Sequence, residues 1–204
     1  SAFPIEYFNI SMDGEALENM DFHRHLDEGA VTYYPKYPVL APVTDGSGYG
    51  GYILKAIDDA FEQADDGDTL TLLRDVSLGG QDTAVTAGSD ISLVLPPEIT
   101  LAAPVSGSSV TVAADKTLTL SGWYEDGATG NGGESGGALV IGDEAQLTVS
   151  GTLYNSGNIV LQGEDGGNLS GVIVLRLGGE VYSGLDRDEQ VRNWIKYEDG
   201  PYYT

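Results

Sequence analysis

The sequence predicts a mostly β protein whose short strands stack as a parallel β-helix (a solenoid), with an N-terminal capping α-helix and an irregular N-terminal extension. Three observations predict it. The chain of 204 residues carries 29 glycines, short β-prone runs recur between residues 69 and 183, and one amphipathic helix pattern stands directly before them. An antiparallel β-sandwich is the alternative, although two-residue hairpin signals such as Asn-Gly are almost absent between the runs.

Residues 1–48 differ in composition from the rest and form the expected extension, rich in aromatic residues and proline. Pro35, Pro38 and Pro42 disfavour a helix and predict extended chain over residues 33–42. The glycine-rich run 44–51 then predicts a loop. We expect the β-helix domain to cover residues 49–204.

Residues 52–64 are the only strong helix pattern, and they would form the cap. One face carries Ile53, Ile57, Ala60, Phe61 and Ala64. An open end of stacked strands invites aggregation, so a helix placed before the first strand would cover it. The turn residues 65–68 end this helix, and residues 69–73 alternate as a strand does.

The β-prone runs repeat as pairs joined by a short turn. Leu93 and Leu101 lie eight residues apart, as do Val110 and Leu118. We interpret each pair as one coil, which predicts roughly five coils over residues 69–183 and a rod about 25 Å long. The pairs read ISLVL-PPE-ITLAA, SVTVA-ADK-TLTLS, ALVI-GDEA-QLTVS and VIVLRL-GG-EVYS.

Alternation along these strands predicts which side chains face the core. Their outward neighbours are mainly Ser, Thr, Asn, Lys and Gln. The predicted inward residues are Leu93, Leu95, Ile99, Leu101, Val110, Val112, Leu118, Leu120, Leu139, Ile141, Leu147, Val149, Ile159, Leu161, Ile173 and Leu175.

The C-terminal segment 185–204 is the expected second cap. Residues 186–196 predict a short helix with Val191, Trp194 and Ile195 on one side, and the aromatic tail 201–204 would close the last coil.

Charge and composition narrow the function. The 32 acidic and 9 basic residues give a net charge of −23, which opposes binding to nucleic acid or anionic lipid and leaves calcium, sugars and cationic partners open. The absence of cysteine excludes a disulfide scaffold and fits a reducing cytosol or a Gram-positive-type cell exterior. No apolar stretch reaches the ~20 residues of a membrane span, and no signal peptide stands at the start.

Two segments resemble a known family. Residues 54–76, with an alanine-rich helix and Gly-Asp-Thr before the first strand, resemble the opening segment of secreted bacterial right-handed parallel β-helix (pectin-lyase-like) proteins, surface and adhesin-type members included. The run Gly151-Thr-Leu-Tyr-Asn-Ser-Gly-Asn-Ile-Val-Leu161 resembles one of their coils. The resemblance covers residues 52–183 and implies the right-handed fold, but this family includes lyases, hydrolases, adhesins and passive stalks.

The segment 21–27 is a candidate metal site. In an extended chain Asp21, His23, His25 and Asp27 share one face, and imidazole with carboxylate suits zinc or a similar divalent ion. A solvated polar strand or turn is the other interpretation, because two histidines lack a third partner of their kind.

Two further features are candidate ligand sites. The acidic glycine-rich loops 125–134 and 164–168 carry oxygen ligands that calcium prefers, or they are solvated loops. Trp123 and Tyr124 could stack on a sugar ring, or cover the side of a coil.

These observations favour a non-catalytic, secreted or cell-surface bacterial module, adhesin-like or stalk-like, whose partners would be glycans or a host or cell-surface protein. The alternative is a polysaccharide lyase or glycoside hydrolase. Such an enzyme needs carboxylates clustered on strands, whereas the acids here fall mostly in turns: Glu98, Asp115, Asp143, Glu144, Glu164 and Asp165.

Overall fold

The protein is described by a computed structural model covering most of the chain after residue 36. The backbone is described for residues 11–12, 15–16, 22–27, 30–35, 37–44, 50–80, 83–122, 137–163, 168–176 and 178–198, and the side chains for 37–43, 51–80, 83–122, 137–163, 168–176 and 178–198.

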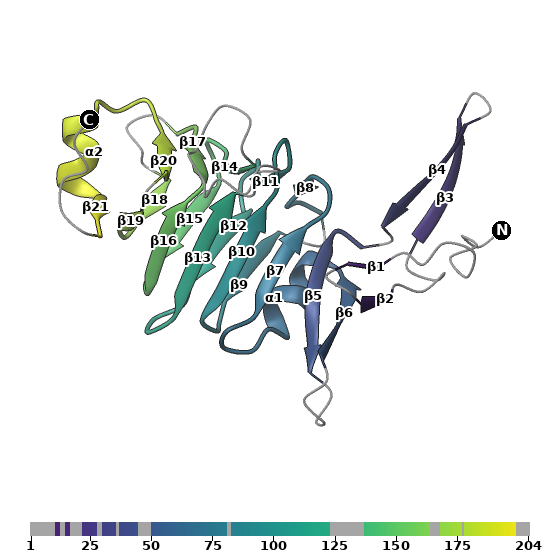
Figure 1. Ribbon diagram of the computed structural model, residues 1–204. Coiled ribbons are helices and arrows are strands. Elements are labelled where there is room, and N and C mark those ends of the chain that lie inside the picture. The colour runs from purple at the N-terminus through teal and green to yellow at the C-terminus, as the bar shows by residue number, and fades with distance from the viewer. Residues whose placement is uncertain are drawn as a thin grey trace.

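Three sheets built mainly from parallel strands dominate the fold (Figure 1). The largest holds, in spatial order, β21 (Ile195–Tyr197), β19 (Ile173–Leu175), β16 (Thr152–Ser156), β13 (Thr117–Gly122), β10 (Ile91–Leu95), β7 (Thr69–Leu72), β5 (Val39–Thr44) and β6 (Gly50–Lys55). A five-stranded sheet holds β20 (Glu180–Tyr182), β17 (Asn158–Leu161), β14 (Ala138–Ile141), β11 (Thr100–Ala103) and β8 (Val76–Ser77). A four-stranded sheet holds β18 (Leu169–Ser170), β15 (Gln146–Val149), β12 (Ser109–Val112) and β9 (Ala84–Ala87).

The chain visits the three sheets in turn, and we call one visit to each a circuit. β10, β11 and β12 form one circuit, after which β13 returns to pair in parallel with β10. All strand pairs formed among β7 to β21 are parallel. A sandwich of antiparallel hairpins is therefore wrong for this part of the chain.

The repeating unit differs from the predicted pair of strands. Leu93 pairs with Leu120 in the largest sheet, whereas Leu101, eight residues after Leu93, lies in the five-stranded sheet and pairs with Leu139. A tight turn redirects the chain into the next sheet, so the two strands that it joins are not hydrogen-bonded to each other. The unit that stacks is the three-strand circuit.

The core lies between the sheets and contains the inward residues that alternation predicts. Every one of the sixteen is buried except Ile99, which is partly buried and packs against the others. Leu118, Leu153, Ile173 and Ile195 stack in register along the largest sheet. Each such side chain contributes about 1.5–3 kcal/mol by leaving water, so the stacked columns supply much of the stability.

The corners between sheets reuse one turn. In six turns, five at corners between sheets and one between α1 and β7, the fourth residue donates its N–H to the carbonyl of the first, as Ile99 does to Pro96 at 3.1 Å. In all of these except the turn at residues 142–145, the third residue has a positive φ, which a type II turn requires. That residue is Gly67, Glu98, Gly107, Asp115 or Gly178.

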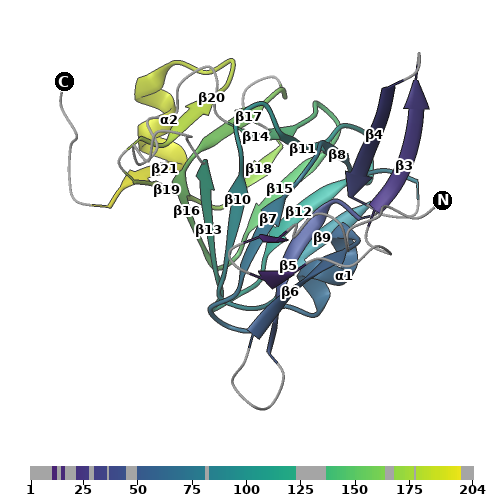
Figure 2. The same cartoon turned by 45° about the vertical axis from the view of Figure 1, so that its right-hand side comes forward.

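The first helix is shorter than predicted. α1 spans Ile57–Glu62, and residues 50–55 form β6, which pairs antiparallel with β5. Along β6, Leu54 is buried and Ile53 is exposed, which is the two-residue period of a strand. Ile57, Ala60 and Phe61 face the core as expected, and α1 packs against β9 (Figure 2).

β5 lies within the segment predicted to be an irregular extension, yet it belongs to the largest sheet. Val39 and Leu40 pair antiparallel with Leu72 and Thr71 of β7. The extended chain predicted over residues 33–42 is confirmed for residues 33–35 and 39–42, which lie in β4 (Ala30–Pro35) and β5, whereas residues 37–38 form a bend. Pro42 is tolerated because it lies beyond the residues of β5 that pair with β7.

The C-terminal helix is also shorter than predicted. α2 spans Arg187–Asn193, and the side chain of Asp186 caps it by accepting the N–H of Glu189 at 3.0 Å. Val191 is exposed, contrary to the prediction, and Gln190 is the buried residue of this helix. Ile195 is buried as a strand residue of β21.

The remaining described elements are two short antiparallel pairs near the N-terminus. β1 (Ser11–Met12) pairs with β2 (Glu15–Ala16), and β3 (Phe22–Asp27) pairs with β4. Within the described part of the chain, neither helix has the length and apolar character needed to cross a membrane.

Candidate binding surface

The outward side chains of β7, β10, β13 and β16 form a surface that we call the outer wall. They alternate with buried core residues, so each strand contributes every second side chain to it. Two rows run across the strands in register, Thr69–Ser92–Thr119–Tyr154 and Thr71–Val94–Ser121–Ser156, and Thr117 and Thr152 form a third, shorter row.

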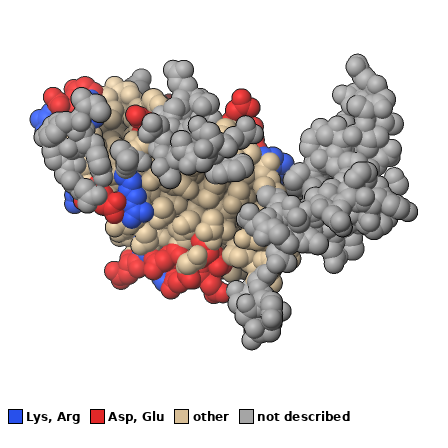
Figure 3. All heavy atoms as spheres, viewed as in Figure 1, with Lys and Arg blue, Asp and Glu red and all other residues tan. Residues whose placement is uncertain are grey.

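The outer wall is rich in hydroxyl groups and carries no Lys, Arg, Asp or Glu among its described residues. Figure 3 shows an uncharged field across the middle of the molecule, with acidic side chains along its lower edge. That edge is where the turns before β7, β10 and β13 lie, and they carry Asp65, Asp66, Asp68, Asp90 and Asp115. A ligand on the wall would meet neutral donors and acceptors.

Two of these turn carboxylates, those of Asp66 and Asp90, bind backbone N–H groups of the next circuit. Asp66 Oδ1 accepts the N–H of Asp90 at 2.8 Å, and Asp90 Oδ1 accepts that of Thr117 at 2.7 Å. At another corner Asp75 Oδ1 accepts the N–H of Thr100, also at 2.8 Å. These acids satisfy donors at the ends of strands, which is a structural role.

Asp66 also binds a lysine, Lys116, at 3.0 Å. The hydrogen bond from the Asp90 backbone, followed by that from Lys116, lowers the pKa of Asp66. The hydrogen bond to Asp66 raises the pKa of Lys116. Both shifts favour the charged forms, so neither group is prepared for proton transfer at neutral pH.

A three-residue cluster lies beside the outer wall toward the C-terminus. The Arg176 guanidinium carbon lies 3.7 Å from the centre of the Tyr154 ring, and the same guanidinium binds Glu198 through Nε at 2.8 Å and a second nitrogen at 3.0 Å. The hydrogen bonds that Arg176 donates to Glu198 are the main reason that the pKa of Arg176 is raised. One face of the Tyr154 ring is thereby covered by a cation.

The segment 151–161 places a buried asparagine at a corner. Asn155 is fully buried, its Oδ1 accepts the Gly157 N–H at 3.0 Å, and its Nδ2 donates to the Glu180 carbonyl at 2.9 Å. Asn155 follows Leu120 in an otherwise apolar column. Its role is to satisfy backbone groups where two circuits turn.

The predicted zinc site is only partly within the described residues. His23, His25 and Asp27 lie in β3, where His25 pairs with Thr32 of β4, but their side chains and the whole of Asp21 are outside the described residues. Trp123 and Tyr124, which follow the last residue of β13 in sequence, are outside them as well.

The predicted calcium loops lie largely beyond the described chain. Loop 125–134 is outside it, and of loop 164–168 only Asn168 is inside. Asn168 Nδ2 donates to the Gly142 carbonyl at 2.9 Å. Among the residues whose side chains are described, no group of three or more His, Asp or Glu lies close enough to hold a metal ion.

The sequence predicts that outward strand positions are rich in hydroxyl groups, but it does not predict which of these positions lie together in the outer wall. The signal that defines it is the alternation of Thr and Ser with Leu in TLTL, ISLVL and TLTLS, but grouping these runs on one sheet requires the three-strand circuit. Its chemistry suits hydrogen bonding to a flat, neutral partner. No protein-family model, no curated protein and no solved structure matches this chain.

Proposed function

We propose that this chain is a right-handed parallel β-helix of the kind found in secreted bacterial surface proteins, and that it acts as a non-catalytic module presenting its outer wall to glycans. The parallel pairing and the passage of the chain through three sheets support the β-helix. The resemblance of residues 52–183 to pectin-lyase-like proteins supports a secreted or cell-surface location.

The observation that carries the proposal is the contrast between the wall and the turns. The outward positions of β7, β10, β13 and β16 hold hydroxyl groups at every place except Val94, whereas Asp66, Asp75 and Asp90 use their carboxylates to accept backbone N–H groups. A lyase or hydrolase of this fold would need carboxylates free to converge on a sugar. A neutral wall of hydroxyls instead favours binding by hydrogen bonds to sugar hydroxyls.

The regular spacing of side chains across the wall suits an extended polymer. Adjacent strands are spaced about 4.8 Å apart, so equivalent hydroxyls recur at a regular interval from Thr69 to Thr119. Tyr154 adds an aromatic side chain to this row, which continues through Val174 and Lys196 of the next two strands, and sugar rings pack on aromatic surfaces through their apolar faces.

The test is a screen of the intact chain against polyuronates and neutral polysaccharides, with and without calcium, measuring both binding and product release. We expect binding of a neutral glycan with no turnover. Turnover of any substrate contradicts the proposal and supports the lyase or hydrolase interpretation.

A matched pair of variants locates the binding. Thr119→Glu places a charge in the middle of the outer wall, and Thr111→Glu places the same charge at an outward position of β12 in the four-stranded sheet. We expect Thr119→Glu to weaken glycan binding by roughly tenfold or more, because a tenfold change corresponds to ~1.4 kcal/mol, which is the scale of a buried unpaired polar contact. We expect Thr111→Glu to leave glycan binding unchanged. Equal effects, or none, would contradict a role for the wall.

A further inference from the structure

The largest sheet changes its surface chemistry at the end formed by β5 and β6. Leu40 of β5 pairs with Thr71 of β7 on one side and with Leu54 of β6 on the other, so one hydroxyl row of the outer wall continues into two leucines. Pro42 and Tyr52 pair with each other and lie on the same side of the sheet. We call Leu40, Pro42, Tyr52 and Leu54 the apolar patch.

The two leucines of the apolar patch are buried, although they point away from the core. Leu40 is 3% exposed and Leu54 is 5% exposed. Neither belongs to the core cluster, which Val39 and Ala41 join from the opposite face of β5. Val94, an outward apolar residue with a strand on each side, remains partly exposed. Leu54 lies in the last described strand of the sheet, where an uncovered side chain would be more exposed still. Another part of the protein therefore lies over the patch.

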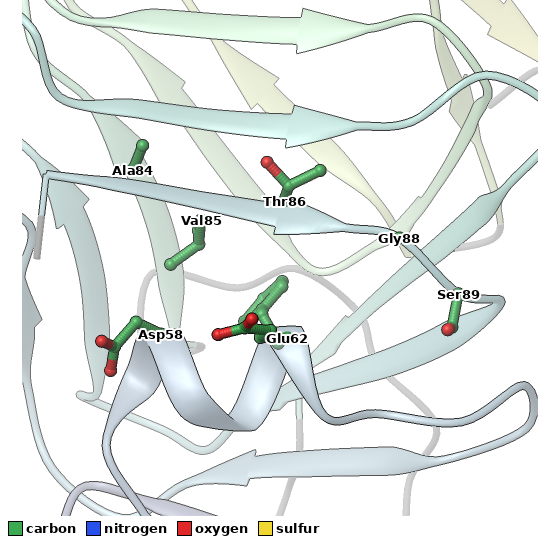
Figure 4. A pocket seen from close by; sticks show the side chains of 8 residues that line it. Asp58, Glu62, Ala84, Val85, Thr86, Gly88 and Ser89 are labelled. Carbon is green, nitrogen blue, oxygen red and sulfur yellow. The ribbon is translucent and has the colours of Figure 1, made fainter.

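The helix at this end of the molecule does not cover the patch. α1 packs against β9 and β5 with Phe61 in the core cluster, and a pocket bordered by Asp58 and Glu62 lies beside it (Figure 4). Leu40 and Leu54 point to the other side of the largest sheet. α1 thus covers the inner face of this end, and its outer face is left to another element.

β1 and β2 are the described elements that lie next to the patch. They pair with each other and form a two-stranded sheet of their own. Figures 1 and 2 both place them beside β5 and β6, whereas β3 and β4 project away from the sheets. We propose that the β1–β2 pair docks on the apolar patch and covers Leu40 and Leu54.

The docked pair ends the outer wall at β7. The hydroxyl rows stay open from β7 to β16, but a ligand that follows them onto β5 meets the β1–β2 pair and must displace it. Displacement exposes two leucines in line with the wall, so the pair also limits the apolar surface that the protein presents to solvent. The docking is independent of glycan binding by the outer wall.

The composition of the intact chain makes this docking measurable by NMR. The chain has no cysteine and only two methionines, Met12 in β1 and Met20. A nitroxide spin label on one introduced cysteine broadens the signals of nearby nuclei, and the ε-methyl signal of Met12 in carbon-13 methionine-labelled protein is the reporter. A Met12→Leu variant assigns that signal.

Two label positions at opposite ends of one row of the outer wall give the comparison. Thr69→Cys and Lys196→Cys are five strand spacings apart, or about 24 Å. We expect the label at position 69 to broaden the Met12 signal strongly, and the label at position 196 to leave it nearly unchanged.

A matched pair of variants tests whether the patch holds the β1–β2 pair. Leu54→Gln places an amide in the patch, and Ile53→Gln makes the same kind of change at the neighbouring residue of β6, which is 42% exposed on the other face. With the label at position 69, we expect Leu54→Gln to restore most of the Met12 intensity and Ile53→Gln to leave the broadening unchanged. Circular dichroism checks that each variant is folded, and the comparison of label positions decides the matter if Leu54→Gln is not.

Three results would overturn the proposal. Equal broadening by the two labels, or none by the label at position 69, would show that β1 does not lie at this end of the wall. Broadening that persists in a folded Leu54→Gln variant would show that the patch does not hold the pair. Equally strong broadening between chains, in a mixture of spin-labelled protein and methionine-labelled protein, would assign the patch to a second copy.

Discussion

Lys116 Nζ lies 3.0 Å from Asp66 Oδ1, although the turns that carry them precede β13 and β7, with the whole of β10 between. Asp90, in the turn before β10, lies between them. Its N–H donates to Asp66, and its carboxylate accepts the Thr117 N–H. Three successive circuits are thus joined at one edge by side chains, in addition to the strand ladders.

This chain of contacts makes stability depend on pH. The pKa of Asp66 is lowered from its ordinary 3.8, so its ionised form stabilises the fold above that pH, and this contribution is lost as the pH falls through the lowered value. The pKa of Lys116 is raised from 10.5, so its contribution is complete below that pH and is lost as the pH rises through the raised value. Between these two pKa values, both the Asp66 and the Lys116 contributions to stability are present.

We therefore expect Asp66→Asn to lower the thermal unfolding midpoint at pH 7 and to have progressively less effect as the pH falls below 3.8, because the native carboxylate then becomes protonated. Asparagine keeps an oxygen that can accept the Asp90 N–H, so the difference reports the charge. Midpoints measured from pH 2 to pH 8 by circular dichroism test this. A difference that stays constant over that range would contradict it.

The corner turns predict a second set of effects. Glu98 has a φ of 64° at the turn position where Gly107 has 87°. Residues with a side chain are strained in this region and glycine is not. We expect Glu98→Gly to stabilise the fold by up to about 1 kcal/mol and Gly107→Ala to destabilise it by about 1 kcal/mol, measured by urea unfolding. Changes of the same sign in both variants would refute the type II assignment.

Gly151 predicts a larger loss. A Cβ atom there would overlap the backbone carbonyl oxygens of Ala113 and Lys116, which belong to the previous circuit. Backbone atoms cannot move aside without separating the strands, so we expect Gly151→Ala to cost about 1–3 kcal/mol. Gly184→Ala is the control, because its Cβ would meet nothing within 4 Å. Similar urea midpoints for the two variants would contradict this close approach of circuits.

The leucine columns predict the largest loss. Leu118 is fully buried and pairs with Ile91 on one side and Leu153 on the other. We expect Leu118→Ala to cost about 2–5 kcal/mol, and Thr119→Ala, on the outer wall next to it, to cost far less. Urea unfolding of both variants provides the measurement, and comparable losses would place Leu118 outside the core.

Sequence alternation predicted the strands and their buried faces well, because each strand has one face in the core and one in solvent. The predicted unit of two strands was wrong because the corner turns are as short as hairpin turns, and the stacking partner of Leu93 is Leu120, not a residue of the next strand. Only the three-dimensional path of the chain reveals which strands are neighbours.

The first helix shows why the boundaries of the elements were harder to predict from the sequence. Ile53 and Ile57 fit the spacing of a helix, but residues 50–55 are held as a strand by pairing with β5, a tertiary contact that local spacing does not encode. The turn aspartates show the same limit for the candidate site. Asp90 looks like an ordinary turn residue in the sequence, and its partner Thr117 belongs to the next circuit.

The central claim is that strands of successive circuits stack in parallel and in register, because the outer wall exists only in that arrangement. The chain has no cysteine, so a disulfide between two introduced cysteines can be detected without interference from native ones. Thr111 of β12 faces Thr148 of β15 and Thr86 of β9 on opposite sides. Oxidation of Thr111→Cys/Thr148→Cys should give one intramolecular disulfide, since adjacent strands lie about 4.8 Å apart. Thr86→Cys/Thr148→Cys should give none, because those positions are two strands apart. A disulfide in the second pair, or its absence in the first, would contradict the stacking.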